Sequence, residues 1–137
     1  MLALSVSVSV GCVTGRVTRI DSMTTTPETV VCGTKRVEAP ALCLKARPPF
    51  RSSPGPIHLS AEILGAIDWC PSRIYWDFGD GGRHAEDATS CSQTLWSEDR
   101  PYGYGQYYVR FVAIDRDGAV RARGSMPVEV RNMREGQ

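Results

Sequence analysis

An antiparallel β-sandwich is the fold that the sequence predicts for this 137-residue chain. Short segments rich in valine, isoleucine, threonine and tyrosine alternate between apolar and polar residues with the period of two that half-buried strands show. Glycine (13 residues) and proline (9 residues) break the chain between these segments, and the strands recur at roughly ten-residue spacing, which is typical of a sandwich. No window of about eleven or more residues keeps a helical period, so the prediction is all-β.

The N-terminal part contains three segments that read as strands, at 15–23, 28–34 and 41–46. They hold too few apolar residues for a core of their own, so we expect them to pack against the rest of the chain. The stretch "ARPPFRSSPGP" at 46–56 follows, and residues before proline favour extended geometry. The sequence therefore predicts a β extension with a Pro-rich linker over 13–51 and a sandwich domain over 52–132, with residues 1–12 as a separate segment.

The predicted sandwich domain contains four strands. The apolar faces of the first three are formed by Ile57, Leu59 and Ala61, by Ile74, Trp76 and Phe78, and by Tyr107, Val109, Phe111 and Ala113. The fourth strand, "AVRARGSMPVEV" at 119–130, includes Pro127, which cannot donate a hydrogen bond to a β ladder. We expect this last strand to lie near a sheet edge or to contain a bulge.

Charge and residue inventory argue against several classes of function. The 16 lysines and arginines are scattered and balance 15 acidic residues, so no nucleic-acid partner is predicted. No apolar run approaches the roughly 18 residues of a membrane-spanning helix. The chain has two histidines and no HExxH or CxxC spacing, and the sequence therefore predicts neither a metal site nor a cofactor.

Residue types found in hydrolases occur together at His84, Glu86, Asp87 and Ser90. Residue type without geometry is weak support for catalysis, because an exposed polar loop has the same composition. His58 falls on the polar face of its strand, where we expect it to contact solvent. The sequence therefore predicts a protein that is not an enzyme.

The stretch "RIYWDFGDGG" at 73–82 allows two interpretations, a structural turn or a cation site. Trp76 and Phe78 share one strand face and should be core residues. Three glycines suit the positive φ of a tight turn, and a two-residue turn at Asp80-Gly81 is the expected hairpin connection. These glycines are Gly79, Gly81 and Gly82. Because a calcium site needs six or more oxygen ligands, we expect Asp77 and Asp80 to cap backbone N–H groups.

The same stretch resembles the signature of the PKD (polycystic kidney disease) domain, an immunoglobulin-like sandwich of extracellular and cell-surface proteins. The WDFGDG motif of that family is repeated by Trp76, Asp77, Phe78, Gly79, Asp80 and Gly81, and its HxY and GxYxV positions are matched by Tyr102, Gly105, Tyr107 and Val109. The resemblance runs from about Pro56 to Val130 and includes "PIHLSA" as a first strand and a turn from Asp115 to Gly118.

The chain departs from the family pattern in two places. Arg100 stands where the family has the histidine of HxY, and an insertion with Cys91 and Trp96 precedes the tyrosine block. Both departures concern loop geometry more than the fold. The resemblance therefore implies an immunoglobulin-like (PKD-type) antiparallel β-sandwich located outside the cytoplasm.

An extracytoplasmic location makes disulfides expected among the five cysteines. Cys32 and Cys43 enclose about ten residues, and closing this loop contributes roughly 2–3 kcal/mol, so we predict that they pair. A two-residue turn at Asp80-Gly81 would place Cys70 directly opposite Cys91, which predicts the second disulfide.

Cys12 is left over, and two interpretations of its surroundings stay open. The stretch "LALSVSVSVGC" resembles a bacterial lipobox that ends in a lipidated cysteine, although Ser9 stands where leucine is usual and no basic residue precedes the apolar run. The alternative is that the alternation at 5–10 marks a strand. A lipid on Cys12 is the only membrane attachment that the sequence suggests.

The outward positions of two neighbouring strands carry unusually apolar residues. These are Tyr75, Tyr108, Val112 and Ile114, with Trp69 or Trp96 as a further member. Either the N-terminal segment 13–45 or a partner should cover this face, because large apolar patches mark interfaces. We therefore expect a protein or glycan partner as the alternative to internal packing.

The function that the sequence predicts is a non-catalytic exported module that mediates protein or carbohydrate contacts in the cell envelope or a surface assembly. The expected location is the periplasm, the outer membrane or the cell surface. Two other functions remain as alternatives: an accessory domain of a secreted hydrolase system, and a structural subunit of a virion or extracellular appendage.

Overall fold

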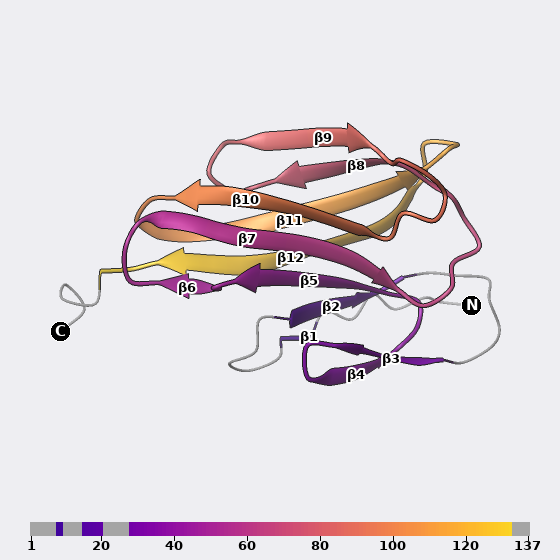
Figure 1. The fold of residues 1–137 in the computed structure, drawn as a ribbon, viewed down its shortest axis with the longest axis horizontal. Coiled ribbons are helices and arrows are strands. Elements are labelled where there is room, and N and C mark those ends of the chain that lie inside the picture. The colour runs from indigo at the N-terminus through magenta and orange to yellow at the C-terminus, as the bar shows by residue number, and fades with distance from the viewer. Residues whose placement is uncertain (1–7, 10–14, 21–27, 133–137) are drawn as a thin grey trace.

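The computed structural model describes residues 8–9, 15–20 and 28–132, and all regular elements within them are β-strands (Figure 1). The strands are β1 Val8–Ser9, β2 Gly15–Arg19, β3 Thr29–Cys32, β4 Lys35–Glu38, β5 Ala41–Arg47, β6 Phe50–Arg51, β7 Gly55–Leu64, β8 Pro71–Asp77, β9 Arg83–Asp87, β10 Leu95–Tyr102, β11 Gly105–Asp115 and β12 Val120–Val130. The described residues include no helix long and apolar enough to cross a membrane.

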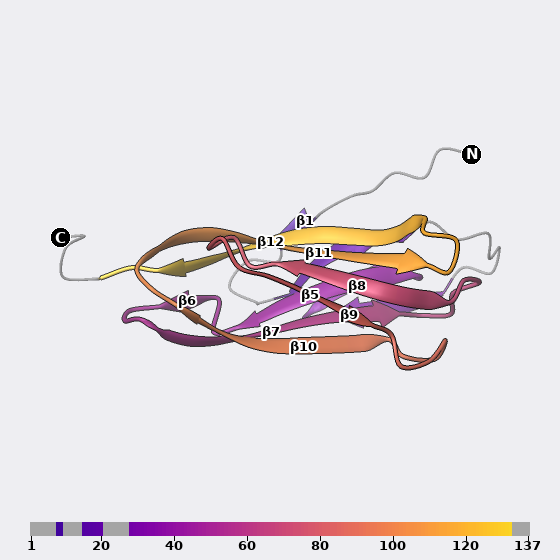
Figure 2. The same cartoon turned by 90° about the horizontal axis from the view of Figure 1, so that it is seen from above.

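Two five-stranded sheets lie face to face and enclose a common core (Figure 2). The first sheet has the order β1-β2-β5-β7-β10, and the second has the order β6-β12-β11-β8-β9. The pair β6 and β12 is parallel, and the other neighbours are antiparallel. β3 and β4 form a separate hairpin. The predicted all-β architecture is confirmed.

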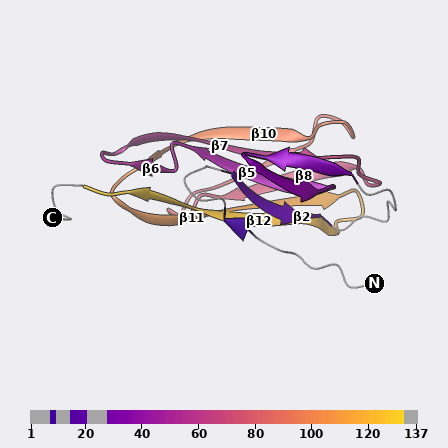
Figure 3. The ribbon, with the colours of Figure 1, turned by 90° about the horizontal axis from the view of Figure 1, so that it is seen from below.

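The predicted N-terminal extension is part of this sandwich, so the boundary at residues 51 and 52 does not separate two units. β5 lies between β2 and β7 and pairs with β7 along its whole length (Figure 3). Leu42 and Leu44 of β5 are buried in the same core cluster as Trp76. The prolines of 46–56 lie on the crossing from β5 to β7, where β6 pairs with β12 of the other sheet. They keep this crossing extended and do not form a linker between domains.

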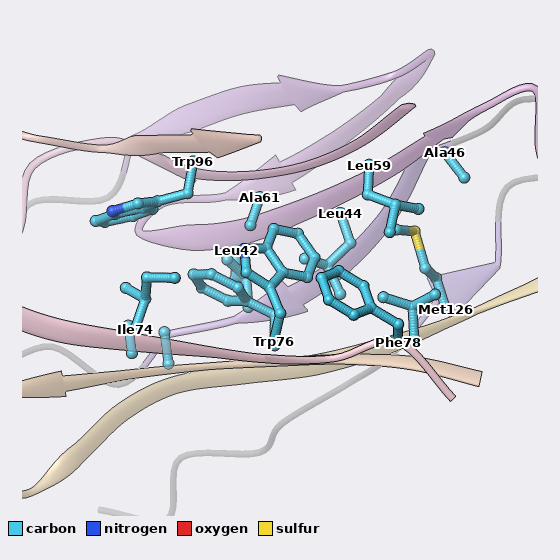
Figure 4. Close-up of a cluster of buried hydrophobic side chains, with 14 of the residues drawn as sticks. Leu42, Leu44, Ala46, Leu59, Ala61, Ile74, Trp76, Phe78, Trp96 and Met126 are labelled. Atoms are coloured by element: carbon cyan, nitrogen blue, oxygen red, sulfur yellow. The ribbon is translucent and has the colours of Figure 1, made fainter. Parts of the chain in front are cut away.

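Aromatic rings fill the centre of the core (Figure 4). Trp76 is 1% exposed, and its ring meets that of Phe111 edge to face with centroids 4.8 Å apart. Trp96 comes from the opposing sheet and lies 5.7 Å from the same phenylalanine ring. The buried leucines of the first sheet pack against these rings, among them Leu42, Leu44 and Leu59.

The β3–β4 hairpin is bonded to the first sheet by the Cys32–Cys43 disulfide that the sequence predicts, with Cα atoms 5.6 Å apart. Both cysteines belong to a second small apolar cluster that also contains Val17 and Ala41. Because successive side chains of a strand point to opposite faces, Cys43 and its neighbour Leu42 serve two different clusters. The hairpin therefore covers the outer face of the first sheet.

The β8–β9 hairpin differs from the predicted register by one residue. Asp77 pairs with Arg83, and the connecting loop spans 78–82 instead of the two-residue turn predicted at Asp80-Gly81. Inside this loop the N–H of Phe78 donates to the carbonyl of Gly82 at 3.0 Å.

The Cys70–Cys91 disulfide forms nevertheless, and its Cα atoms are 4.6 Å apart. Cys70 precedes β8, which begins at Pro71, and Cys91 follows β9, which ends at Asp87. The chain there is not held to the hairpin register, so a shift of one residue does not prevent the bond. The predicted pairing is confirmed although the turn behind it is wrong.

Strand β10 is absent from the sequence prediction because its alternation is weakly apolar, whereas β9 is the second arm of the hairpin that the sequence predicts. Within "LWSEDRPY" of β10 only Trp96 and Tyr102 are buried. Both strands are sheet edges, a position that also tolerates Pro101. The edge position predicted for Pro127 is confirmed, since β6 pairs with β12 only at Glu129 and Val130.

Cys12 lies outside the described residues, and its lipidation stays a prediction. The short strand β1 pairs with Arg16 and Val17 of β2, an arrangement that agrees with the strand alternative for this segment.

Replacing Trp76 with alanine should reduce the free energy of unfolding by about 3–5 kcal/mol, because it leaves a cavity at the centre of the core. Urea unfolding of the oxidised protein measures the change. Tyr108→Ala is the matched control, since that ring is 60% exposed and its loss should cost less than about 1 kcal/mol. Equal stability of the Trp76→Ala variant and the parent protein would show that this ring does not hold the sheets together.

Candidate functional site

Tyr75, Tyr108, Val112 and Ile114 share the outer face of the second sheet, and we call this set the tyrosine face. Tyr75 of β8 is the Cα partner of Val112 in β11, and Ile114 is the next outward residue of the same strand. Tyr108 is 60% exposed and Tyr75 is 40% exposed. The structure therefore brings the four predicted contact residues onto one side of a hydrogen-bonded sheet.

Arginines that the sequence analysis did not assign surround the tyrosine face. The guanidinium of Arg73 lies over the ring of Tyr75, 5.6 Å from its centroid. Arg110 stands between Tyr108 and Val112 along β11, and Arg123 of β12 is the Cα partner of Val112. Neither of these last two arginines forms an ion pair with another described residue. Their outward positions follow from strand alternation, which is the signal that would have found them.

The described part of the N-terminal segment does not cover the tyrosine face. β2 and β5 extend the first sheet, and the β3–β4 hairpin is bonded to that sheet. The expectation that segment 13–45 packs on this face is therefore wrong for residues 15–20 and 28–45. Trp69 and Trp96 do not belong to the face either, because both are buried in the core.

The loop at 78–82 between β8 and β9, which we call the signature turn, lies beside this face. Two aspartates hold its backbone. Asp77 Oδ1 accepts a hydrogen bond from the N–H of Gly79 at 3.0 Å, and Asp80 Oδ1 accepts one from the N–H of Gly82 at 2.8 Å. Both predicted backbone caps are confirmed. A shallow hollow of about 480 Å³ lies between the turn and the Tyr108 end of the tyrosine face.

Two of the three turn glycines have the predicted backbone conformation. The φ angles of Gly79 and Gly81 are 78° and 93°, in the region that favours glycine. Gly82 does not have a positive φ, which corrects the prediction for that residue. A Cβ atom at Gly79 would also approach the carbonyl oxygen of Tyr108 to 2.5 Å. Both the φ angle and this close contact therefore disfavour any other residue at position 79.

Arg100 of β10 links the turn to the opposite sheet. Its Nε donates to Asp80 Oδ2 at 2.8 Å, and its guanidinium lies 4.8 Å from the centroid of the Phe78 ring. Partial burial opposes ionisation of the Asp80 carboxyl, but the hydrogen bonds from Arg100 and from the N–H of Gly82 outweigh it and hold the pKa of Asp80 below its ordinary value.

Tyr102 makes a second connection between the turn and the first sheet. Its hydroxyl donates to the carbonyl oxygen of Phe78 at 2.7 Å, and the residue is buried. Burial, together with the negative charge of Asp80, raises the pKa of Tyr102 far above its ordinary value. The phenol therefore stays neutral and acts as a structural donor.

Asp115 organises the turn between β11 and β12 in a similar way. Its carboxylate accepts hydrogen bonds from Arg121 Nε at 2.6 Å and from the backbone N–H groups of Asp117 and Ala119 at 2.9 and 3.0 Å. The hydrogen bond from Arg121, followed by that from Ala119, lowers the pKa of Asp115. The carboxylate is buried and its ionised form is the one that the fold favours.

The residue types of a hydrolase do not assemble into one site. Asp87 bonds to Arg73 at 2.8 Å, and the Ser90 hydroxyl bonds to that of Ser92 at 2.9 Å. His84 and Glu86 turn instead toward Glu98 of β10. His58 is partly exposed and pairs with Asp99 at 2.6 Å. No serine, histidine and carboxylate triad is formed by these residues.

Comparison of the chain with family models, with curated proteins and with solved structures finds no match. The tyrosine face and the fold that presents it are therefore the features that bear on function.

Stability should fall as the pH drops below about 4, because the pKa values of Asp80 and Asp115 are lower in the folded chain than in the unfolded chain. Such groups stabilise the fold above their unfolded pKa, and the contribution is lost as the pH falls through the folded pKa. The Asp115→Asn variant should therefore show a shallower loss of stability in acid, measured by urea unfolding between about pH 2 and pH 6.

Arg121→Gln provides the matched test of cause, since it removes the first hydrogen-bond donor while keeping the Asp115 carboxyl. We expect this variant to lose part of the same acid dependence. An acid limb of unchanged slope in both variants would contradict the assignment.

Proposed function

We propose that this chain is an immunoglobulin-like sandwich of the PKD type that acts as a non-catalytic binding module outside the cytoplasm. The partner is a protein or a glycan, and the tyrosine face contacts it. The observation that carries the proposal is an apolar, arginine-flanked face left open to solvent by the described residues and placed on a sheet whose other side is fully packed.

Strand order supports the immunoglobulin-like part of the proposal. The main strands of one sheet are β5, β7 and β10, and the other sheet has the order β12, β11, β8 and β9. When these strands are labelled in chain order as A, B, C, E, F and G, with β9 as C′ and no strand D among the described residues, the sheets contain A-B-E and G-F-C-C′. Immunoglobulin-like domains divide their strands between two sheets in this manner.

Two local features point the same way. The hydroxyl of Tyr107, near the start of β11, donates to the carbonyls of Gly103 and Tyr104 at 3.0 and 3.1 Å. This contact resembles the tyrosine corner at the start of strand F in immunoglobulin-like domains. Trp76 on β8 occupies the place of the buried tryptophan of strand C and packs against Phe111 of β11.

The two disulfides support an extracytoplasmic location, because such bonds persist in oxidising compartments. Together they join β3 to β5 and close the loop that carries the signature turn. A chain that depends on these bonds fits the periplasm, the outer membrane or the cell surface.

The composition of the tyrosine face favours a protein as the partner. Tyrosine and arginine are enriched at protein interfaces, and Val112 and Ile114 add aliphatic surface between them. Arg73 is preordered over Tyr75, so little side-chain freedom is lost when this pair is covered. The hollow beside Tyr108 offers space for a side chain of the partner.

A photocrosslinking amino acid at position 108 should capture the partner from an envelope extract, while the same group at Tyr104 should not. Tyr104 is 55% exposed but lies in the loop between β10 and β11, outside the tyrosine face. The captured protein is then purified and its affinity for the oxidised chain is measured. Tyr75→Ala and Tyr108→Ala should each weaken binding by about tenfold or more, and Tyr104→Ala should leave it unchanged.

A glycan array probed with the same variants distinguishes the two classes of partner. Binding of a sugar that depends on Tyr108 would assign a glycan instead of a protein. If neither a protein nor a sugar binds in a manner that depends on Tyr75 and Tyr108, the proposed function is wrong.

A further inference from the structure

A histidine and two glutamates converge at the edge of the sandwich where the two sheets face each other. His84 and Glu86 belong to β9, the edge strand of the second sheet, and Glu98 belongs to β10, the edge strand of the first sheet (Figure 2). The Nε2 atom of His84 lies 3.2 Å from Glu98 Oε1 and 3.5 Å from Glu86 Oε1. The three side chains offer ligand atoms that all lie within 4.8 Å of one another.

Strand register explains why these side chains meet. His84 is the Cα partner of Trp76, and Glu86 is the Cα partner of Ile74, so both follow the core-facing side of their sheet. Glu98 lies two residues after the buried Trp96 and faces the same interior from the other sheet. The three groups therefore close the rim of the core, where each side chain is partly exposed.

A proton on His84 Nε2 cannot bond to both carboxylates equally well. A ring nitrogen donates at most one N–H, and that hydrogen can point directly at only one of the two carboxylates. The two carboxylates are left close to each other, and like charges at this separation repel. A divalent cation in place of the proton would be bonded to all three groups at once.

The separations between the ligand atoms suit such an ion. Zinc lies about 2.0–2.2 Å from nitrogen and carboxylate ligands in tetrahedral geometry, so two of its ligand atoms stand about 3.3–3.5 Å apart. The distances of 3.2 and 3.5 Å around His84 Nε2 lie close to this range. Rotation of the partly exposed Glu86 carboxylate would adjust its separation from Glu98.

We propose that His84, Glu86 and Glu98 bind a first-row divalent transition metal, with zinc as the representative ion. One imidazole and two carboxylates form three protein ligands, and water completes the coordination. Calcium is disfavoured, because it takes six to eight oxygen ligands and this set offers a nitrogen and only two carboxylates. The sequence predicted no metal site because Glu98 lies in a strand whose alternation it did not reveal.

The metal joins the edge strands of the two sheets. The structure brings β9 and β10 together through side chains at this rim, so an ion held by both strands acts as a clip on the folded state. The unfolded chain does not hold the three ligands in place, and metal binding therefore stabilises the fold. The site lies on the core-facing side of β9, apart from the tyrosine face, and the proposal does not depend on the proposed function.

Isothermal titration of the oxidised, chelator-treated full chain with zinc tests the site. The titration uses a Cys12→Ser background, because the fifth cysteine is the remaining thiol that could bind zinc. We expect one zinc ion per chain and no comparable binding of calcium. His84→Gln and Glu98→Gln should each weaken zinc binding by about 30-fold or more, since each removes one of three ligands.

His58→Gln is the matched control, because His58 is the only other histidine and pairs with a single carboxylate, that of Asp99. This variant should bind zinc as the parent does. Thermal unfolding gives a second measurement: saturating zinc should raise the Tm of the parent and of His58→Gln by roughly 5–10 °C and leave that of His84→Gln unchanged. The site is refuted if the parent fails to bind zinc, or if His84→Gln binds it as tightly as the parent does.

Discussion

The contact between Trp76 and Phe111 is the interaction on which the rest of the sandwich depends. It places β8 beside β11 with both rings inside, and strand alternation then sends Tyr75 and Val112 to the outer face. A shift of one residue along either strand would bury the tyrosines and expose the tryptophan, at a cost of several kcal/mol. The position of the tyrosine face is thus a consequence of how the core is packed.

Polar contacts between the sheets gather along the side formed by β8, β9 and β10. Arg100 bonds to Asp80, and the Tyr102 hydroxyl donates to the Phe78 carbonyl. These contacts surround the signature turn and the rim of the core. Arg100 adds a charged pair at this place, and the low pKa of Asp80 reflects it. Side chains therefore connect the two sheets along this edge, where no backbone hydrogen bonds join β9 to β10.

Sequence patterns were sufficient to predict the structure wherever it depends on neighbouring residues in the chain. The alternation around Trp76 and Tyr107 and the aspartate caps of the turn follow from rules that act over a few residues, and the Cys32–Cys43 disulfide closes a short loop. The prediction failed where the structure depends on which strands pair or face each other. β10 keeps only Trp96 and Tyr102 buried, so its alternation is weak, and Glu98 could not be placed opposite His84 without knowing which sheet edges meet. The prolines of 46–56 indicated an extended crossing, but composition does not distinguish a crossing between sheets from a linker between domains.

Strand alternation also separates the residues that hold the fold from those of the proposed contact surface. Along β11 the residues Val109, Phe111 and Ala113 are fully buried, while Tyr108, Arg110 and Val112 face outward. A change on the outward set leaves the core packing intact, so the proposed binding surface can vary while the fold stays constant. The rim at β9 and β10 obeys a different constraint, because its side chains must reach across from two sheets. A cation held there would depend on the spacing of the sheets, and the inward rings, with Trp76 at their centre, set that spacing.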